Sequence, residues 1–417
     1  MRLYLKNIGM IKEADVKLDG LTVIAGENDT GKSTVGKVIF SIVKGIQKYE
    51  ENIGKKIEDR IEEIGKILID LSVRKLLKKD DKINELNELN LLLSNLDKLN
   101  KNKINLNEFL SSLKKLDNKE IKSIVKEIEN LILKDEKSLK EEALKRSFFS
   151  EFRTQLKLNN IEYGEIKLTE NNEENIKIIV KNEIELNDEF SLILEDVTLI
   201  ETPMILNFSN MIQSARSHFE EEELNKNKLS RIEPDIVYHS KDLINKLVNS
   251  VKYNFDKKID NELLNFLKFD FDYIDETKEF IYVKNNKKYY MINTADGIKS
   301  FGIIKILLKG QYIRKNTLLV IDEPEVHLHP KWQIEYAKLI VELVKKGIKV
   351  LITSHSPFFI DAIDKLSYDI KRNYYFAENG IIKKDNDLKL MYEKLNVAID
   401  ELEDLEIEEM FFKAKYD

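Results

Sequence analysis

The residues best placed to do chemistry lie in a glycine-rich stretch near the N-terminus. Residues 26–33 read GENDTGKS and match the pattern G-x-x-x-x-G-K-[ST] in full. An apolar run, Leu21–Ala25, precedes the stretch, as expected for a buried strand, and apolar residues at helical spacing follow it from Val35. This strand–loop–helix order is the setting in which such a loop binds the phosphates of a nucleotide. We therefore predict nucleotide binding.

Each position of the loop has a physical role. Gly26 and Gly31 allow a tight turn whose backbone N–H groups point at phosphate oxygens. Lys32 is expected to place its charge on the β- and γ-phosphates and so to act in catalysis, and the Ser33 hydroxyl is expected to bind Mg²⁺. The other loop residues predicted to bind ATP are Glu27, Asn28, Asp29, Thr30 and Thr34.

A pair of carboxylates follows a second apolar run far along the chain. Leu318–Ile321 reads as a buried strand that ends in Asp322 and Glu323. Asp322 can hold Mg²⁺, and Glu323 can orient and deprotonate the attacking water, which typically contributes about 10²–10⁴-fold. The alternative is that Glu323 caps the following turn or pairs with a lysine.

Histidines occur at two places near the carboxylates. Lys349–Thr353 reads as a third buried strand, and His355 follows it, at the edge where ligands bind in open α/β sheets. A lone histidine is more often structural, but its place after this strand favours a catalytic role. Ser356 is predicted to cap the next helix. His327 and His329 form H-x-H, which is too few ligands for zinc and is more typical of a loop that packs at a protein interface.

The rest of the chain must position these groups. No glycine or proline occurs from Lys66 to Tyr163, and leucine and isoleucine recur there at helical spacing. We predict several amphipathic helices over residues 51–147, with an antiparallel coiled-coil hairpin as one arrangement. This region is either a solvated insertion or an arm that contacts a partner. Residues 162–200 are β-rich, residues 203–267 are helical, and residues 279–283 and 288–292 form a hairpin.

The segments GENDTGKST, LLVIDEPEVHLHP and SHSP together resemble the ABC-type ATPase heads of the RecF, SMC and OLD lineage, over about residues 1–48 and 273–417. The resemblance implies an α/β fold: a P-loop ABC-type head with a mixed sheet flanked by helices, an antiparallel β subdomain, and a long helical or coiled-coil insertion. The expected divisions are 1–48 (head with P-loop), 49–150 (insertion), 151–203 (β-rich segment), 204–272 (helical segment) and 273–417 (remainder of the head).

The resemblance also implies that ATP is held between two heads. A signature segment of one copy would face the P-loop of the other, and its best match is Ala295, Asp296 and Gly297, with Ala295 where serine is usual. His355 would contact the γ-phosphate. The loop EVHLHP would cross the dimer interface. Two candidates for the Q-loop are the segment Leu199–Pro203 and Gln213.

The expected cofactors are ATP and Mg²⁺, and the expected assembly is a homodimer or a higher even oligomer. Too little chain follows His355 for the Toprim nuclease domain of OLD proteins, so any effector activity is expected from a separate chain, a nuclease or a toxin, or from the insertion. The chain is similar to ATPase subunits of bacterial anti-phage systems of the PARIS, Septu and retron-associated types. One alternative is a DNA-binding ATPase in repair or maintenance, as in RecF and SMC proteins. Another is a nucleotide-binding scaffold with little turnover.

The composition of the chain argues against some classes of function. Lys plus Arg is 68 and Asp plus Glu is 75, for a net charge of −7, which is not the balance of a dedicated nucleic-acid binder. The chain has no cysteine, which excludes disulfides and Cys-ligated metal sites. No run of 18 apolar residues is present, and the N-terminus has the alternation of a strand rather than a signal peptide. We therefore expect a cytoplasmic protein without membrane contact.

Overall fold

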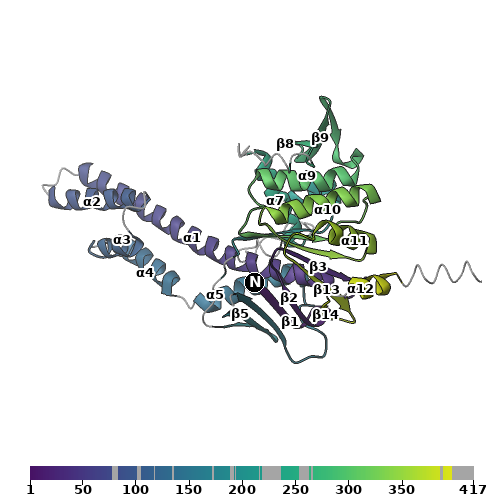
Figure 1. The fold of residues 1–417 in the computed structure, drawn as a ribbon. Coiled ribbons are helices and arrows are strands. Elements are labelled where there is room, and N and C mark those ends of the chain that lie inside the picture. Colours follow the sequence, from purple (N-terminus) through teal and green to yellow (C-terminus); the bar gives the residue numbers. More distant parts are fainter. Residues whose placement is uncertain are drawn as a thin grey trace, which may run out of the picture. The chain divides into compact units, whose positions relative to one another are not determined.

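The structure is a computed structural model. It falls into two compact units, one formed by Met1–Gly45 with Ala143–Asp417 and the other by Ile46–Glu142. Figure 1 shows the fold. The structure describes residues 1–77, 83–100, 105–116, 118–133, 136–170, 173–187, 192, 194–215, 217, 236–252, 263, 266–385 and 388–396.

Parallel strands form the centre of the first unit. They pair in the order β13-β3-β12-β11-β7 within an eleven-stranded sheet. Their residues are buried at nearly every position, as expected for strands covered on both faces. This confirms the three buried strands predicted beside the motifs. The bounds are Leu21–Gly26 (β3), Asp196–Ile200 (β7), Thr317–Asp322 (β11), Lys349–Ser354 (β12) and Arg372–Glu378 (β13).

Largely antiparallel strands continue the same sheet beyond β13, in the order β14-β2-β1-β4-β5-β6. The mixed sheet is therefore confirmed, but the antiparallel part is continuous with the parallel part in one sheet. The β-rich segment 151–203 is split between the two edges, because β4 to β6 end one edge and β7 forms the other. The bounds are Arg2–Ile8 (β1), Ile11–Lys17 (β2), Gly164–Glu170 (β4), Glu173–Val180 (β5), Ile184–Leu186 (β6) and Ile381–Lys384 (β14).

A small second sheet has the order β10-β9-β8, with bounds Asp270–Ile274 (β8), Glu279–Lys284 (β9) and Lys287–Tyr290 (β10). The predicted hairpin is present. Its turn passes through Asn285 and Asn286, whose φ angles of 51° and 59° suit a two-residue hairpin turn. The second strand ends at Tyr290, earlier than predicted, because residues 291–293 form a 3₁₀ turn.

Helices cover both faces of the parallel strands. Helix α1 (Lys32–Leu77) starts at the P-loop, and its Gly36 lies so close to the sheet that a Cβ there would be 2.7 Å from the Val320 side chain. On the other face, helices α9, α10 and α11 lie over the sheet (Figure 1) and share one apolar core with its strands. The bounds are Pro203–Phe208 (η1), Ser209–Ser214 (α6), Tyr238–Lys252 (α7), Asp296–Lys309 (α9), Pro330–Lys345 (α10), Pro357–Leu366 (α11) and Leu388–Leu395 (α12).

The second unit is helical and confirms the helices predicted over residues 51–147. It contains the later part of α1, the helices α2 (Ile83–Asn100), α3 (Leu106–Leu113) and α4 (Lys119–Leu133), and the start of α5 (Glu136–Phe152). It has an apolar core of its own, which includes Leu68, Phe109, Leu113, Ile121 and Ile128. A separate core is what allows the segment to be compact by itself.

Helices α1 and α5 each pass from one unit into the other without a break. The divisions expected after residues 48 and 150 therefore fall inside helices, and the one expected after residue 272 falls inside β8. Of the expected helical segment 204–272, the structure describes η1, α6 and α7, and the stretch 218–235 lies outside the described residues. No helix in the described part of the chain combines the length and apolar character needed to cross a membrane.

Candidate active site

Three of the predicted motifs follow neighbouring parallel strands. The P-loop follows β3, Asp322 ends β11, and His355 follows β12. Because parallel strands end at the same edge of a sheet, the fold brings these groups together there. A pocket of about 480 Å³ opens at this edge. Its lining includes Asn28, Asp29, Thr30, Gly31, Lys32, Ser33, Thr34, Glu201, Asp322, Glu323 and His327.

The P-loop has the backbone geometry that its glycines predict. A Cβ at Gly26 would lie 2.4 Å from the carbonyl oxygen of Ala377, so no other residue fits there without a shift of the backbone. Gly31 has a φ of +91°, and Asp29 adopts a φ of 66°. Helix α1 begins directly after this turn, so its free N–H groups and the positive end of its dipole face the pocket. The loop can therefore bind phosphate.

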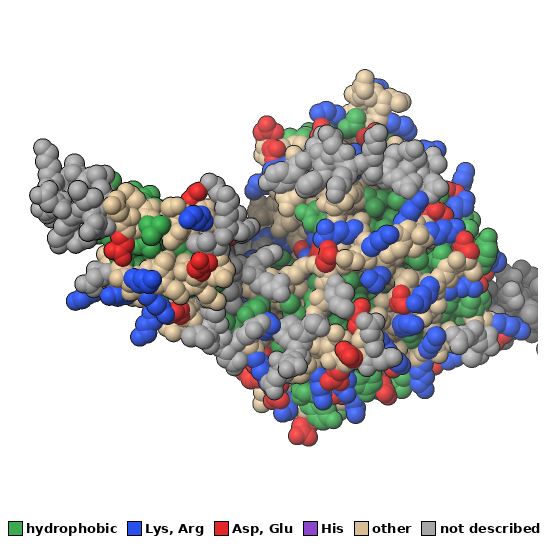
Figure 2. Space-filling model, turned by 60° about the vertical axis from the view of Figure 1, so that its left-hand side comes forward, with side chains coloured by type: hydrophobic (Ala, Val, Ile, Leu, Met, Phe, Trp, Pro, Cys, Tyr) green, Lys and Arg blue, Asp and Glu red, His purple; other side chains and the backbone are tan. Residues whose placement is uncertain are grey.

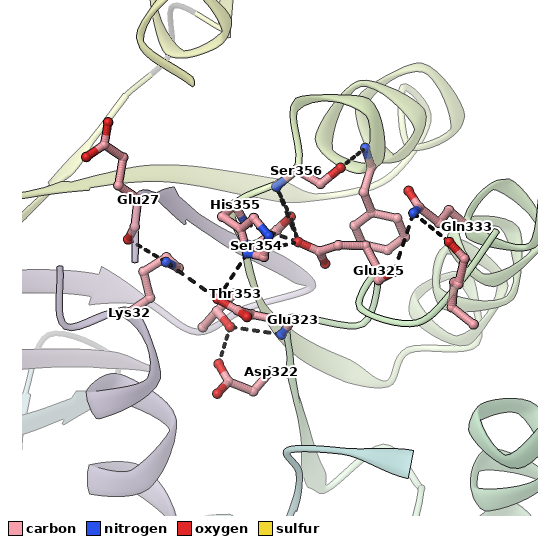
Figure 3. A network of polar contacts seen from close by, with 12 residues as sticks. Glu27, Lys32, Asp322, Glu323, Glu325, Gln333, Thr353, Ser354, His355 and Ser356 are labelled. Carbon is pink, nitrogen blue, oxygen red and sulfur yellow. Dashed lines mark hydrogen bonds and ion pairs between the residues drawn. The ribbon is translucent and has the colours of Figure 1, made fainter. Parts of the chain in front are cut away.

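Lys32 lies between the loop and the predicted base. Its Nζ donates a hydrogen bond to the Glu27 carbonyl oxygen at 2.6 Å and lies 3.7 Å from Glu323 Oε1 (Figure 3). Only 4% of the side chain is exposed. Burial lowers the pKa of Lys32, and the carboxylates of Glu323 and Asp322 oppose this shift. The ammonium group is thus held inside the site where a phosphate can reach it.

Ser33 and Asp322 meet although they are far apart in sequence. Ser33 Oγ donates to Asp322 Oδ1 at 2.9 Å, and Thr353 Oγ1 donates to the same oxygen. Burial raises the pKa of Asp322, and the negative charges of Glu201 and Glu323 raise it further. A hydroxyl and a carboxylate are oxygen donors of the kind that Mg²⁺ prefers. The described residues contain no cluster of three or more His, Asp or Glu side chains able to hold a metal, so a cation here also needs phosphate and water ligands.

Glu323 and His355 lie side by side. Glu323 Oε1 is 3.1 Å from His355 Nδ1. The backbone of Glu323 is in the left-handed region with a φ of 46°, held by a 3.1 Å hydrogen bond from its N–H to the Thr353 carbonyl oxygen. Such strain in a non-glycine residue is found mainly where the surrounding structure needs one orientation of the side chain. This conformation places the Glu323 carboxylate in the pocket lining, where it can act on a water.

Glu325 is a site residue that the sequence reasoning missed. Its Oε1 accepts hydrogen bonds from Ser354 Oγ at 2.6 Å and from the backbone N–H groups of His355 and Ser356 at 3.1 and 3.2 Å (Figure 3). Burial raises its pKa. Glu325 therefore fixes the turn that carries His355. The predicted cap is confirmed, because Ser356 Oγ accepts from the Phe359 N–H.

The structure separates the two candidates for the Q-loop. Glu201, Thr202 and Pro203, from the segment Leu199–Pro203 after β7, line the nucleotide pocket. Gln213 is not among the lining residues. Its Oε1 accepts from the Tyr273 hydroxyl at 2.7 Å, and its Nε2 donates to the Lys278 carbonyl oxygen. The sequence feature that indicates Glu201 is its position directly after the apolar run of β7.

The signature segment lies at the start of α9. Ala295 is the N-cap residue, and the cap has no side-chain hydrogen bond. Asp296 pairs with the buried Lys299 at 2.8 Å, and Gly297 faces Trp332 of α10. None of the residues 295–297 lines the pocket at the P-loop. Within one chain, the fold does not bring the two predicted halves of the ATP site together.

The two histidines of the H-x-H motif have different places. His327 lines the nucleotide pocket and has a φ of 65°. His329 is the N-cap of α10, where its Nδ1 accepts a hydrogen bond from the Lys331 N–H at 3.3 Å. The motif is thus divided between the pocket and a helix end.

Comparison with known proteins gives matches to a relative in sequence and to solved structures in fold. The Septu protein PtuA of Bacillus thuringiensis is 32% identical over 99 residues, which are 21% of this chain and 25% of that protein. The match thus spans about a quarter of the relative's length. Among solved structures, the SMC head domain from Thermotoga maritima has a TM-score of 0.38 at 12% identity, with 92% of this chain and 97% of that chain covered. The recombination mediator protein RecF has a TM-score of 0.38 at 10% identity, with 92% and 97% covered.

The family comparison covers most of the chain. The AAA ATPase domain family matches residues 1–360, which include the P-loop, Asp322, Glu323 and His355. The ATPase expected from the motifs is confirmed by this match. The chain therefore belongs to the AAA ATPase domain family and is an ATPase built on a mixed α/β sheet.

Proposed function

We propose that the chain is an ATP-driven switch in which Mg²⁺ and ATP bring two copies together and hydrolysis separates them. The observation that carries this proposal is the division of the site. Lys32, Asp322 and Glu323 meet in one pocket, whereas the signature residues at the start of α9 do not line it. A second copy could supply residues 295–297 to complete the site.

The residues of the pocket have complementary roles in the proposed reaction. Lys32 and the backbone N–H groups of the P-loop bind the phosphates. Ser33 and Asp322 would hold Mg²⁺, which neutralises charge on the phosphates when it is bound. Glu323 orients a water and accepts its proton as the oxygen attacks the γ-phosphorus and ADP leaves. His355, whose backbone N–H donates to Glu325, would contact the γ-phosphate.

Gel filtration with light scattering tests the dimer. We expect wild type to elute as a monomer without nucleotide and as a dimer with Mg²⁺ and non-hydrolysable ATP. Glu323→Gln should form the dimer with ATP itself, because the base that ends the bound state is missing. Lys32→Ala is the control and should remain monomeric. A monomer under every condition would overturn the proposal.

We further propose that the switch serves anti-phage defence together with a separate effector, a nuclease or a toxin. The support is the local similarity to the Septu protein PtuA. Figure 2 shows cationic and anionic side chains interspersed over the face in view, a surface that suits a protein partner better than a nucleic-acid backbone. The helical unit Ile46–Glu142 offers one surface for such a partner.

Phage challenge tests the defence role. Cells that carry the gene with its genomic neighbours should form fewer plaques than cells without them, and Lys32→Ala should abolish this protection. Equal plaque counts for wild type and Lys32→Ala would count against a defence role. ATP-dependent DNA binding that weakens steeply with salt would instead support a role in DNA maintenance.

A further inference from the structure

A second pocket, of about 410 Å³, lies in the first unit and shares no lining residue with the nucleotide pocket. Its volume is in the range of pockets that bind small ligands. Three segments form its wall, which are the end of α5, the loop after that helix, and the turn between β5 and β6. Figure 1 shows α5 beside β5.

Basic side chains gather around this pocket, although the chain as a whole has a net charge of −7. Four cations line it, which are Lys145, Arg153, Lys157 and Lys181. The lining also contains Glu183, which pairs with Lys145, and Lys181 pairs with Glu185 at 3.0 Å. With both carboxylates counted, these side chains carry four positive and two negative charges. The pocket therefore attracts anions.

The charges of the lysines are accessible to a ligand. Lys157 Nζ donates a hydrogen bond to the Glu162 carbonyl oxygen at 3.1 Å. Because that oxygen is neutral, the bond does not neutralise the charge of Lys157. The ion pairs of Lys145 and Lys181 join side chains that are each more than 50% exposed. Solvent screens such pairs, so a phosphate can compete with the carboxylates for both lysines.

An aromatic surface lies next to these cations. Phe148 and Phe149 both line the pocket, and Phe149 is 38% exposed whereas Phe148 is buried. The guanidinium group of Arg153 lies over the Phe149 ring, with Cζ 5.8 Å from the ring centre. The Nη1 atom of Arg153 is buried, so this group is enclosed by its surroundings. Aromatic rings and guanidinium planes are the surfaces on which nucleobases stack.

The wall that carries Lys157 is fixed to the main sheet. The Leu156 carbonyl oxygen accepts a hydrogen bond from the Gly9 N–H at 2.8 Å, directly after β1. Lys157 itself forms an antiparallel bridge with Ile8, the last residue of β1. The backbone of this wall is therefore ordered before a ligand binds, which lowers the entropic cost of binding.

We propose that this pocket is a second ligand site, one for a phosphorylated aromatic molecule of the size of a nucleoside monophosphate. Lys157 and Arg153 bind the phosphate, and the aromatic base stacks on Phe149. Asn159 and Asn182 also line the pocket, and their amides can donate and accept hydrogen bonds at the edge of the base. The site binds its ligand without the P-loop, because the two pockets have no lining residue in common.

Isothermal titration calorimetry with AMP tests the proposal. The Lys32→Ala chain is used, so that phosphate binding at the P-loop does not interfere. We expect saturable binding of one AMP per chain. Adenosine and inorganic phosphate should each bind more weakly than AMP, because each makes only part of the contacts.

Substitutions in the same background test the role of charge. Lys157→Gln should weaken AMP binding about fivefold, because one positive charge facing the phosphate is lost. Lys157→Arg keeps the charge and should retain most of the affinity. Glu183→Gln should tighten binding, because it removes a carboxylate from the lining and releases Lys145. Lys365→Gln is the matched control, since Lys365 of α11 is 72% exposed and lies outside the pocket lining, and it should leave AMP binding unchanged.

Three results would overturn the proposal. The first is the absence of saturable AMP binding to the Lys32→Ala chain. The second is an equal affinity of Lys157→Gln and Lys365→Gln for AMP, or of AMP and adenosine for the unsubstituted pocket, since the cations would then have no role. The third is an acidic peptide or a single-stranded DNA that binds more tightly than AMP and loses this binding in Lys157→Gln, because the pocket would then dock a macromolecule.

Discussion

The two compact units differ in whether they bury charged side chains. In the first unit, Lys44 and Lys246 are buried against Asp196 and Asp242, with four ion pairs of 2.5 to 2.9 Å that join α1, β7 and α7. In the second unit, the described ion pairs lie at the surface, as between Arg60 and its neighbours, and the buried cluster consists of leucine, isoleucine, valine and phenylalanine.

This difference shows what each unit requires of its residues. A helical unit with an apolar core needs only volume and spacing, so many sequences would satisfy it. A buried ionic group needs a specific partner at a specific place, because an unpaired charge in the interior is costly. The first unit therefore ties its elements together by specific pairs around the nucleotide pocket.

The largest effect is expected at the base. Glu323→Gln should lower kcat by about 10²–10⁴-fold, because the amide cannot accept a proton from water. Steady-state ATPase assays measure this loss. Glu127→Gln is the matched control in the helical unit, where Glu127 is 49% exposed and pairs with Arg60, and it should leave kcat unchanged. Wild-type turnover by Glu323→Gln would show that another group is the base.

Breaking the buried ionic cluster is expected to have the next largest effect, in this case on the free energy of unfolding. Burial opposes ionisation of Asp196, but Lys246 and Lys44 outweigh it and keep its pKa low. Asp196→Asn leaves a buried positive charge without compensation, so we expect a loss of about 3–5 kcal/mol in the free energy of unfolding. Denaturant titration followed by circular dichroism measures it. A loss below about 1 kcal/mol would mean that the cluster contributes little beyond its packing.

The free energy of unfolding should depend on pH through His239. Its ring nitrogens face Glu151 of α5 and Glu201 after β7. Lys37 of α1 pairs with the other oxygen of Glu201. Burial opposes the charge of His239, but Glu151 and Glu201 outweigh it and raise the pKa from 6.5 to about 9. Its stabilisation is complete below pH 6.5 and is lost as the pH rises through about 9, a change on the order of 3 kcal/mol. Unfolding at several pH values checks this. If His239→Gln lost as much unfolding free energy as wild type over the same rise in pH, the pH dependence would belong to other groups.

The smallest effect is expected in the helical unit. Arg60 pairs with Glu63 at 2.6 Å and with Glu127 at 3.0 Å, but all three side chains are more than 40% exposed. Solvent screens such pairs, so Arg60→Gln should change the free energy of unfolding by at most about 0.5 kcal/mol. A loss comparable to that of Asp196→Asn would remove the contrast between the two units.

Much of the site could be predicted because its signals are local. The P-loop is a continuous pattern, and the strand before each motif is recognisable by its apolar run. Ser33 and Asp322 were each expected to bind Mg²⁺, and the hydrogen bond between them agrees with one shared site. Glu325 and His239 could not be assigned, because their partners lie 29 to 88 residues away in sequence, and Glu201 was indicated only as part of the segment Leu199–Pro203.

The sequence by itself determined the chemistry of this protein, since phosphate-binding and acid–base motifs are short and carry their own local geometry. The tertiary structure decided which strands are neighbours. It placed β7 beside β11, so that Glu201, directly after β7, lines the same pocket as the P-loop. It also decided that α1 runs unbroken out of the ATPase unit. Strand order and buried charge pairs depend on contacts between distant segments, and no local pattern encodes them.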